Sequence, residues 1–98
     1  MPKYMVHIEL RNYPTSKQYT QLDAAMEKLG FARTIVAKGH VRYHLPTADY
    51  YIISAYTPEA LTILVYNVAE QIDPDCAVLT TEAINIWWNG LKRHKQGS

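Results

Sequence analysis

Two segments with helical periodicity, flanked and separated by stretches of strand character, constrain the fold of this chain most strongly. In residues 16–29, apolar side chains recur on one helical face, and Thr15 precedes a glutamine by three positions, the spacing of a capping box. In residues 58–72, Thr57 is a favourable N-cap and Pro58 suits the first helical position. Both segments therefore predict amphipathic helices whose apolar faces need a sheet to cover them.

The segments around these helices read as strands. Residues 3–11 alternate apolar and polar side chains, and residues 31–38 and 49–56 are rich in β-branched and aromatic side chains. Residues 76–81 open a further strand, and residues 82–91 predict either a fifth strand or a short helix. The order β-α-β-β-α-β predicts an α+β, ferredoxin-like sandwich: a four-stranded antiparallel sheet with two helices on one face.

Length and composition favour one folded domain. The chain has 98 residues, of which 48% are hydrophobic and 19% charged, so we expect a domain over 1–91 and a basic flexible tail over 92–98. Its single cysteine, Cys76, excludes an internal disulfide framework and is expected in the core. No apolar run approaches the roughly 20 residues that span a bilayer. We therefore expect a cytoplasmic protein without a membrane partner.

The first strand presents a candidate site on its polar face. His7 and Glu9 are two residues apart, so they share this face at a spacing of about 6–7 Å. A carboxylate such as Glu9 can bind Mg²⁺ or Mn²⁺ with waters completing the shell, and two copies across a two-fold axis could share one ion. His7 could then transfer a proton. The alternative is that both residues form the solvent-exposed face of the sheet.

Basic side chains recur at every second position of residues 38–44. The basic members are Lys38, His40, Arg42 and His44. This spacing on an extended hairpin suits contact with successive phosphates, and Tyr43 between them could stack on a base. The run "KRHK" at 92–95 adds a basic arm. The alternative is ordinary surface charge on a solvated hairpin, and the net charge of +1 neither indicates nor excludes a nucleic-acid partner.

The chain has more aromatic surface than a monomer can bury on a small sheet with one uncovered face. The pair "YY" at 50–51 sends one ring to each face of a strand, and "INIWW" at 84–88 adds two tryptophans that are costly to leave in water. These residues predict a homodimer. Its expected interface comprises Tyr51, Ile84, Ile86, Trp87 and Trp88.

The layout as a whole resembles a known group of proteins. It rests on "MVHIEL" as first strand, "YTQLDAAMEKLGFAR" as first helix, "YYIISAYTPEALTILVYNVAEQID" as a strand running into the second helix, and "DPDCAVLTTEAINIWWNGL" as the closing strand. Over about residues 3–91 this layout is similar to the small ferredoxin-like proteins around the CRISPR-associated metal-dependent nuclease, including compact relatives such as the GhoS-type antitoxin.

The resemblance implies a candidate chemistry. In the nuclease family an aspartate closes the first strand, and two copies hold a divalent metal across the dimer; the matching residue here is Glu9, a glutamate. The family's C-terminal segment crosses onto the partner's sheet. For antitoxin-type ribonucleases, the nearest basic candidates on the sheet are Arg11 and Arg33. The resemblance thus implies Glu9 as a ligand of Mg²⁺ or Mn²⁺, and the candidate catalytic residues are Glu9 and its neighbour on the strand, His7.

Taken together, the sequence predicts a small homodimer that associates with RNA or DNA and has weak or absent metal-dependent endoribonuclease activity. Two alternatives stay open. One is a non-enzymatic module that binds a partner protein, such as an antitoxin or a phage or plasmid accessory protein. The other is a small-ligand sensor that uses the tyrosine-rich open face. The sequence contains no Gly-rich phosphate loop, no paired Cys and His metal spacing and no serine elbow.

Overall fold

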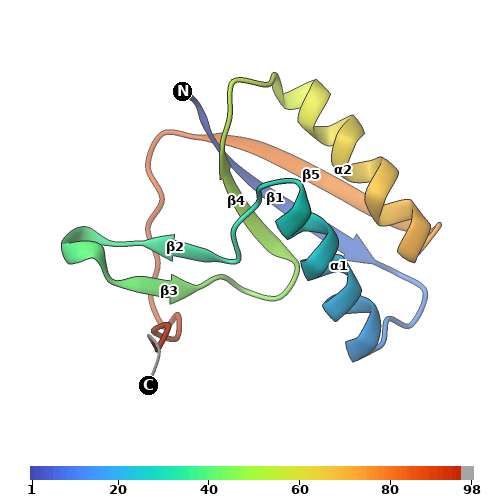
Figure 1. Ribbon diagram of the computed structural model, residues 1–98, viewed down its shortest axis with the longest axis horizontal. Coiled ribbons are helices and arrows are strands. Elements are labelled where there is room, and N and C mark those ends of the chain that lie inside the picture. The colour runs from blue at the N-terminus through green and yellow to red at the C-terminus, as the bar shows by residue number, and fades with distance from the viewer. Residues whose placement is uncertain (96–98) are drawn as a thin grey trace.

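The centre of the molecule is a three-stranded antiparallel sheet. In a computed structural model that describes residues 1–95, β1 (Lys3–Leu10) lies between β4 (Asp49–Ile53) and β5 (Cys76–Ala83). Strand β1 pairs with β5 along its full length, from Lys3 opposite Ala83 to Leu10 opposite Cys76, and Figure 1 shows both strands in the middle of the molecule. The first strand is therefore the central strand of this sheet.

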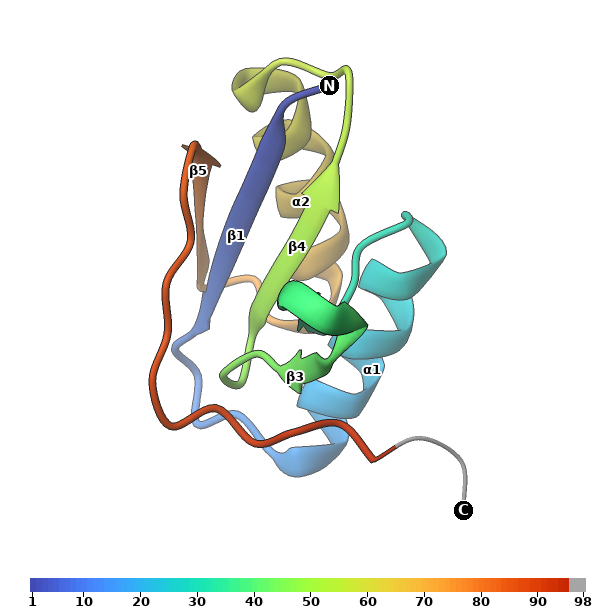
Figure 2. The ribbon, with the colours of Figure 1, turned by 90° about the vertical axis from the view of Figure 1, so that its left-hand side faces the viewer.

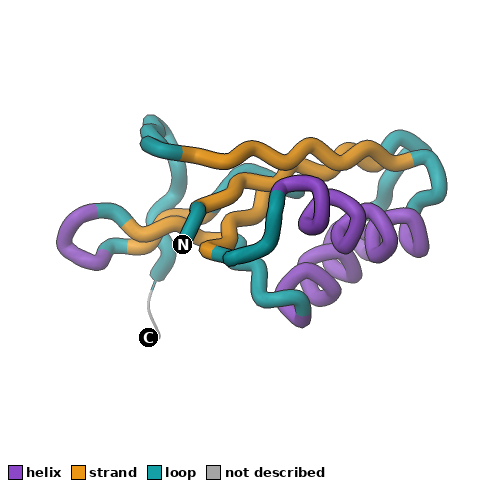
Figure 3. Tube along the Cα trace, turned by 90° about the horizontal axis from the view of Figure 1, so that it is seen from above, coloured by secondary structure: helices purple, strands orange, loops and turns teal. Residues whose placement is uncertain are grey.

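Both predicted helices form and lie on the same face of this sheet. Figures 2 and 3 show α1 (Ser16–Lys28) and α2 (Pro58–Ile72) together on one side of the strands. The capping box is confirmed, because the Thr15 hydroxyl accepts from the Gln18 backbone N–H at 3.2 Å and the Gln18 side chain accepts from the Thr15 N–H at 2.9 Å. Within residues 1–95, neither helix has the length and apolar character needed to cross a membrane.

The core lies between the sheet and the helices. The apolar face of β1 is buried and its other face is exposed or half-buried, which confirms the predicted alternation. Cys76 is also buried, and this burial raises the pKa of its thiol. Tyr50 lies fully inside the core, where its hydroxyl donates to Asp23 at 2.6 Å. Burial and this hydrogen bond raise the pKa of Tyr50.

The segment between α1 and β4 differs from the prediction, which placed a strand over residues 31–38 in the main sheet. It forms β2 (Thr34–Val36), a single 3₁₀ turn η1 (Lys38–His40) and β3 (Arg42–His44), and β2 and β3 make a separate two-stranded sheet. The predicted four-stranded sheet is therefore not confirmed. Ala32 forms a single bridge to the main sheet, by exchanging two backbone hydrogen bonds of 2.8 and 2.9 Å with Tyr51.

Backbone turns and one arginine explain why this hairpin leaves the main sheet. After Ala32 the chain bends at Arg33, whose guanidinium donates to the carbonyls of Pro46 and Asp49, both at 2.9 Å. These bonds hold the base of the hairpin where its two arms leave the sheet. Ala48, just before β4, has a φ of 63°, which no extended strand contains. Strands β3 and β4 are therefore separate strands, with a turn between them.

The residues after β5 form neither of the structures expected for 82–91. Strand β5 ends at Ala83, and residues 84–92 are irregular. The chain then returns to the hairpin, where the His44 N–H donates to the Lys92 carbonyl at 2.8 Å and the His94 N–H donates to the Arg42 carbonyl at 2.9 Å. Of the expected flexible tail, residues 92–94 thus lie against β3, and residues 96–98 lie outside the described part of the chain.

Candidate nucleic-acid interface

His7 and Glu9 lie on the open face of the sheet, as predicted, but each has a partner other than its neighbour. The Nδ1 atom of His7 lies 2.6 Å from Oδ1 of Asp49, on the adjacent strand β4. Oε1 of Glu9 accepts from Nε of Arg11 at 2.6 Å. The two residues therefore belong to two separate polar pairs.

The pair at Glu9 is part of a short ionic chain. Arg11 also reaches Oδ1 of Asp75 at 3.4 Å, and its hydrogen bond to Glu9 raises the pKa of the guanidinium. Within residues 1–95 no three His, Cys, Asp or Glu side chains are grouped as metal ligands. A cation at Glu9 would compete with Arg11, so the magnesium or manganese site remains a prediction.

The predicted phosphate-binding residues lie on the hairpin, and the C-terminal segment joins them. An open groove of about 860 Å³ runs between the hairpin tip and this segment. Its lining residues are Gly39, His40, Val41, Arg42, Arg93, His94 and Lys95, and none of them is acidic. We call this the basic groove. It unites two basic stretches that are about fifty residues apart in the sequence.

Contacts between side chains reinforce the pairing of the C-terminal segment with β3. Nδ1 of His94 lies 3.3 Å from Nε2 of His44, with the two rings edge to face. Tyr43 is half-buried and its ring lies 5.7 Å from that of Trp88, so it is engaged with the protein itself. The ring of Tyr43 is therefore less accessible to a base than a fully exposed ring, and its predicted base-stacking role remains a prediction.

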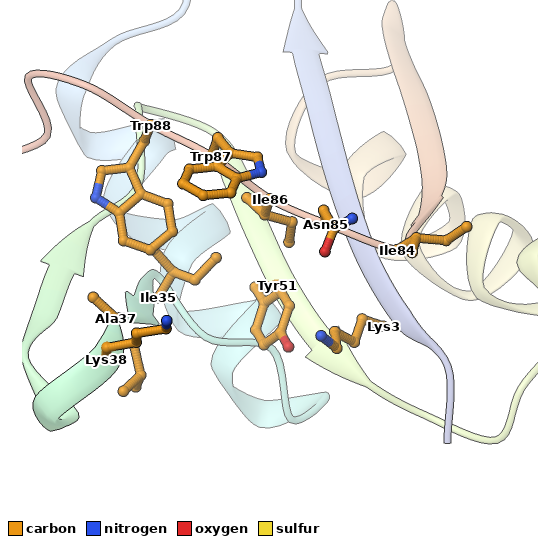
Figure 4. A pocket seen from close by; sticks show the side chains of 11 residues that line it. Lys3, Ile35, Ala37, Lys38, Tyr51, Ile84, Asn85, Ile86, Trp87 and Trp88 are labelled. Atoms are coloured by element: carbon orange, nitrogen blue, oxygen red, sulfur yellow. The ribbon is translucent and has the colours of Figure 1, made fainter.

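A second open groove, of about 670 Å³, lies on the other side of the hairpin. It contains all five residues of the expected dimer interface. Its complete lining is Lys3, Ile35, Val36, Ala37, Lys38, Tyr51, Ile84, Asn85, Ile86, Trp87 and Trp88. We call this the aromatic groove; Figure 4 shows Tyr51 between Lys3 and Lys38 in the view, with the tryptophans across from them. The structure thus brings these aromatic residues next to the basic hairpin.

Charge is strongly segregated along the chain. Residues 34–48 and 84–95, which we call the hairpin lobe, contain five of the ten Lys and Arg residues and none of the nine Asp and Glu residues. They also contain three of the four histidines. The lobe therefore carries +5 and the rest of the chain −4, so the net charge of +1 conceals a dipolar molecule.

Sequence reasoning missed part of this arrangement. Lys3 had no predicted role, yet it lines the aromatic groove. Arg93, His94 and Lys95 were predicted as part of a basic arm over 92–95, but the sequence did not predict that this arm pairs with β3 and lines one groove with the hairpin. Arg11 was predicted to bind nucleic acid, but it lies in the ionic chain with Glu9, away from both groove linings.

Comparison with known proteins adds no identification. No protein-family model matches this chain, and no curated protein sequence matches it significantly.

Proposed function

We propose that this protein binds single-stranded or double-stranded nucleic acid through the basic groove. The observation that carries the proposal is the segregation of +5 onto the hairpin lobe in a chain whose net charge is only +1. Affinity for nucleic acid comes largely from Lys and Arg side chains that neutralise phosphates, and a concentrated patch serves this purpose better than dispersed charge.

The geometry of the groove supports phosphate contact. Arg42 and Arg93 are exposed side chains on adjacent backbone segments, and both line the groove. Arg42 makes a 3.2 Å hydrogen bond to the Thr34 hydroxyl, and no acidic residue lines the groove to neutralise it. The guanidinium groups are therefore available for bidentate contacts with phosphate oxygens.

Charge reversal tests this function. We expect the double variant Arg42→Glu, Arg93→Glu to lose affinity for all sequences alike, because phosphate contacts carry no base information. The slope of log K against log salt should fall by about 0.7–0.9 for each phosphate that the variant no longer neutralises. Fluorescence anisotropy with labelled RNA and DNA over a salt series measures both quantities.

The matched control is Lys17→Glu, Lys28→Glu, which makes the same change in net charge on exposed positions of α1. We expect this control to keep the wild-type salt slope. If both double variants weaken binding equally, overall charge and not the basic groove accounts for the affinity. Wild-type protein that binds neither RNA nor DNA at low salt would overturn the proposal.

The ferredoxin-like arrangement is a further part of the proposal. The bridge between Ala32 and Tyr51 extends the strand order to β5-β1-β4 followed by the chain leading into β2. This is the order of a ferredoxin-like sheet in which the fourth strand is reduced to a single bridge. It supports that fold without supplying the fourth strand.

The homodimer also stays a proposal. Its support is the exposure of Leu79, which is 66% exposed on the open sheet face and lies outside the aromatic groove. Sedimentation equilibrium at high micromolar concentration should give twice the monomer mass. A monomer under those conditions would contradict it.

A further inference from the structure

We propose that the aromatic groove binds the unpaired bases of a nucleic-acid strand, with Trp87 as the stacking surface. This inference rests on the proposed function, and it assigns single strands as the preferred ligand. It starts from the position of Trp87, whose side chain is 90% exposed and lines the groove. Figure 4 shows its indole beside Ile86 at the groove.

The two neighbouring tryptophans differ in exposure and in their contacts with the protein. Trp88 is half-buried and packs against Tyr43 at a ring separation of 5.7 Å. Trp87 makes no ring contact within residues 1–95. Leaving such a large aromatic surface in water without a partner is costly, and a base offers a flat π-face of matching size. Trp88 therefore stabilises the lobe, whereas Trp87 remains open to a ligand.

The charges of the groove favour a nucleic acid over an apolar partner. Lys3 and Lys38 line it, and none of its lining residues is Asp or Glu. Single-strand sites combine aromatic rings for the bases with positive charge for the backbone.

The linings of the aromatic groove and the basic groove are adjacent in sequence at the hairpin tip. Lys38 lines the former, and the next two residues, Gly39 and His40, line the latter. Gly39 has a φ of 81°, which gives the tip its sharp turn. One strand could therefore place its phosphates along the basic groove and its bases against Trp87. A duplex keeps its bases stacked inside and cannot use the second site.

Binding of a short homopyrimidine strand, as DNA and as RNA, and of the duplex of equal length tests this inference. We expect the single strand to bind more tightly and to quench tryptophan fluorescence. Trp87→Ala should weaken single-strand binding about 5- to 150-fold and leave duplex binding and the salt slope unchanged. Trp87→Phe should retain most of the affinity because it keeps an aromatic face.

The matched control is Tyr13→Ala, which removes an aromatic side chain that is 92% exposed and lies outside both grooves. Circular dichroism and urea midpoints check that each variant folds. If Trp87→Ala leaves single-strand binding intact while the arginine variants abolish it, the inference fails and the proposed function stands. If Trp87→Ala instead converts a dimer to a monomer without affecting single-strand affinity, a second copy occupies the groove and the inference also fails. Absence of all nucleic-acid binding overturns both.

Discussion

Two regions of the molecule differ in burial and in charge: the sandwich, which comprises the main sheet and both helices, and the hairpin lobe. The main buried cluster draws its residues from the sheet, the helices and the turns beside them, and none comes from β2, β3 or residues 84–95. The lobe contributes only Ala48 to this cluster, and it is held by short backbone pairings, by the contact of Tyr43 with Trp88 and by two further buried side chains, Ile35 and Leu45. One region is packed and acidic on balance, and the other is open and basic.

This difference shows how a 98-residue chain can keep a packed core apart from a concentrated positive charge. Concentrated positive charge is self-repulsive and would destabilise a compact core. The hairpin lobe leaves the main sheet after Ala32, so repulsion among its positive charges destabilises the core little. The opposite balance of the sandwich brings the net charge of the chain to +1, so the charge proposed to bind phosphate lies apart from the packed core.

The largest expected effect compares packing in the two regions. Leu61 on α2 is fully buried, and we expect Leu61→Ala to lower the free energy of unfolding by about 2–5 kcal/mol, because it removes buried apolar surface and leaves a cavity. Ile84→Ala, at a position 85% exposed in the lobe, should change it by less than about 0.5 kcal/mol. Urea denaturation measures both. Equal decreases would mean that the lobe is part of the same packed core.

A buried carboxylate makes the stability of the sandwich depend on pH. Asp73 accepts backbone hydrogen bonds from Asn12, Asp75 and Arg11, and these bonds, with the charge of Arg11, hold the pKa of its carboxyl below the usual range. A carboxyl whose pKa is lower in the folded state stabilises the fold above the unfolded pKa, and this stabilisation is lost as the pH falls through the folded pKa.

We therefore expect Asp73→Asn to be less stable than wild type at neutral pH and to lose less further stability on acidification. Thermal unfolding between neutral and acidic pH checks this expectation. A variant whose melting temperature runs parallel to that of wild type across this range would show that Asp73 does not contribute to the acid sensitivity.

The rates of amide hydrogen exchange should also differ between the hairpin lobe and the sandwich. The His44 N–H bonds to the Lys92 carbonyl at the surface of the lobe, whereas the amides of β1 lie between two paired strands. We expect the His44 amide to exchange at least about tenfold faster than those of β1, because the lobe opens without unfolding the core. Truncation after Leu91 removes its acceptor and should speed its exchange further. Protection of His44 equal to that of β1 would contradict an independently opening lobe.

The smallest effect is expected at the predicted metal site. Glu9 is exposed and paired with Arg11, so Glu9→Gln should change the free energy of unfolding by no more than about 0.5 kcal/mol. Nucleic-acid affinity should stay within about twofold of wild type, since Glu9 lines neither groove. Should magnesium-dependent cleavage be found in the wild type and vanish in Glu9→Gln, the predicted metal chemistry at this residue would hold.

The amino-acid sequence by itself determined both helices and the central strand. The capping box at Thr15, the N-cap at Thr57 and the alternation of β1 are local patterns, and local patterns depend on hydrogen bonds and burial within a few residues. The basic character of the hairpin was also visible, because charge can be read directly from composition.

Only the tertiary structure decided how the candidate site is assembled. The bend after Ala32 removes β2 from the main sheet, and the return of residues 92–94 to β3 creates the basic groove. The partners of His7 and Glu9 likewise come from other segments or from beyond the strand. These outcomes depend on pairings between residues far apart in the chain, whose free energies no local pattern contains.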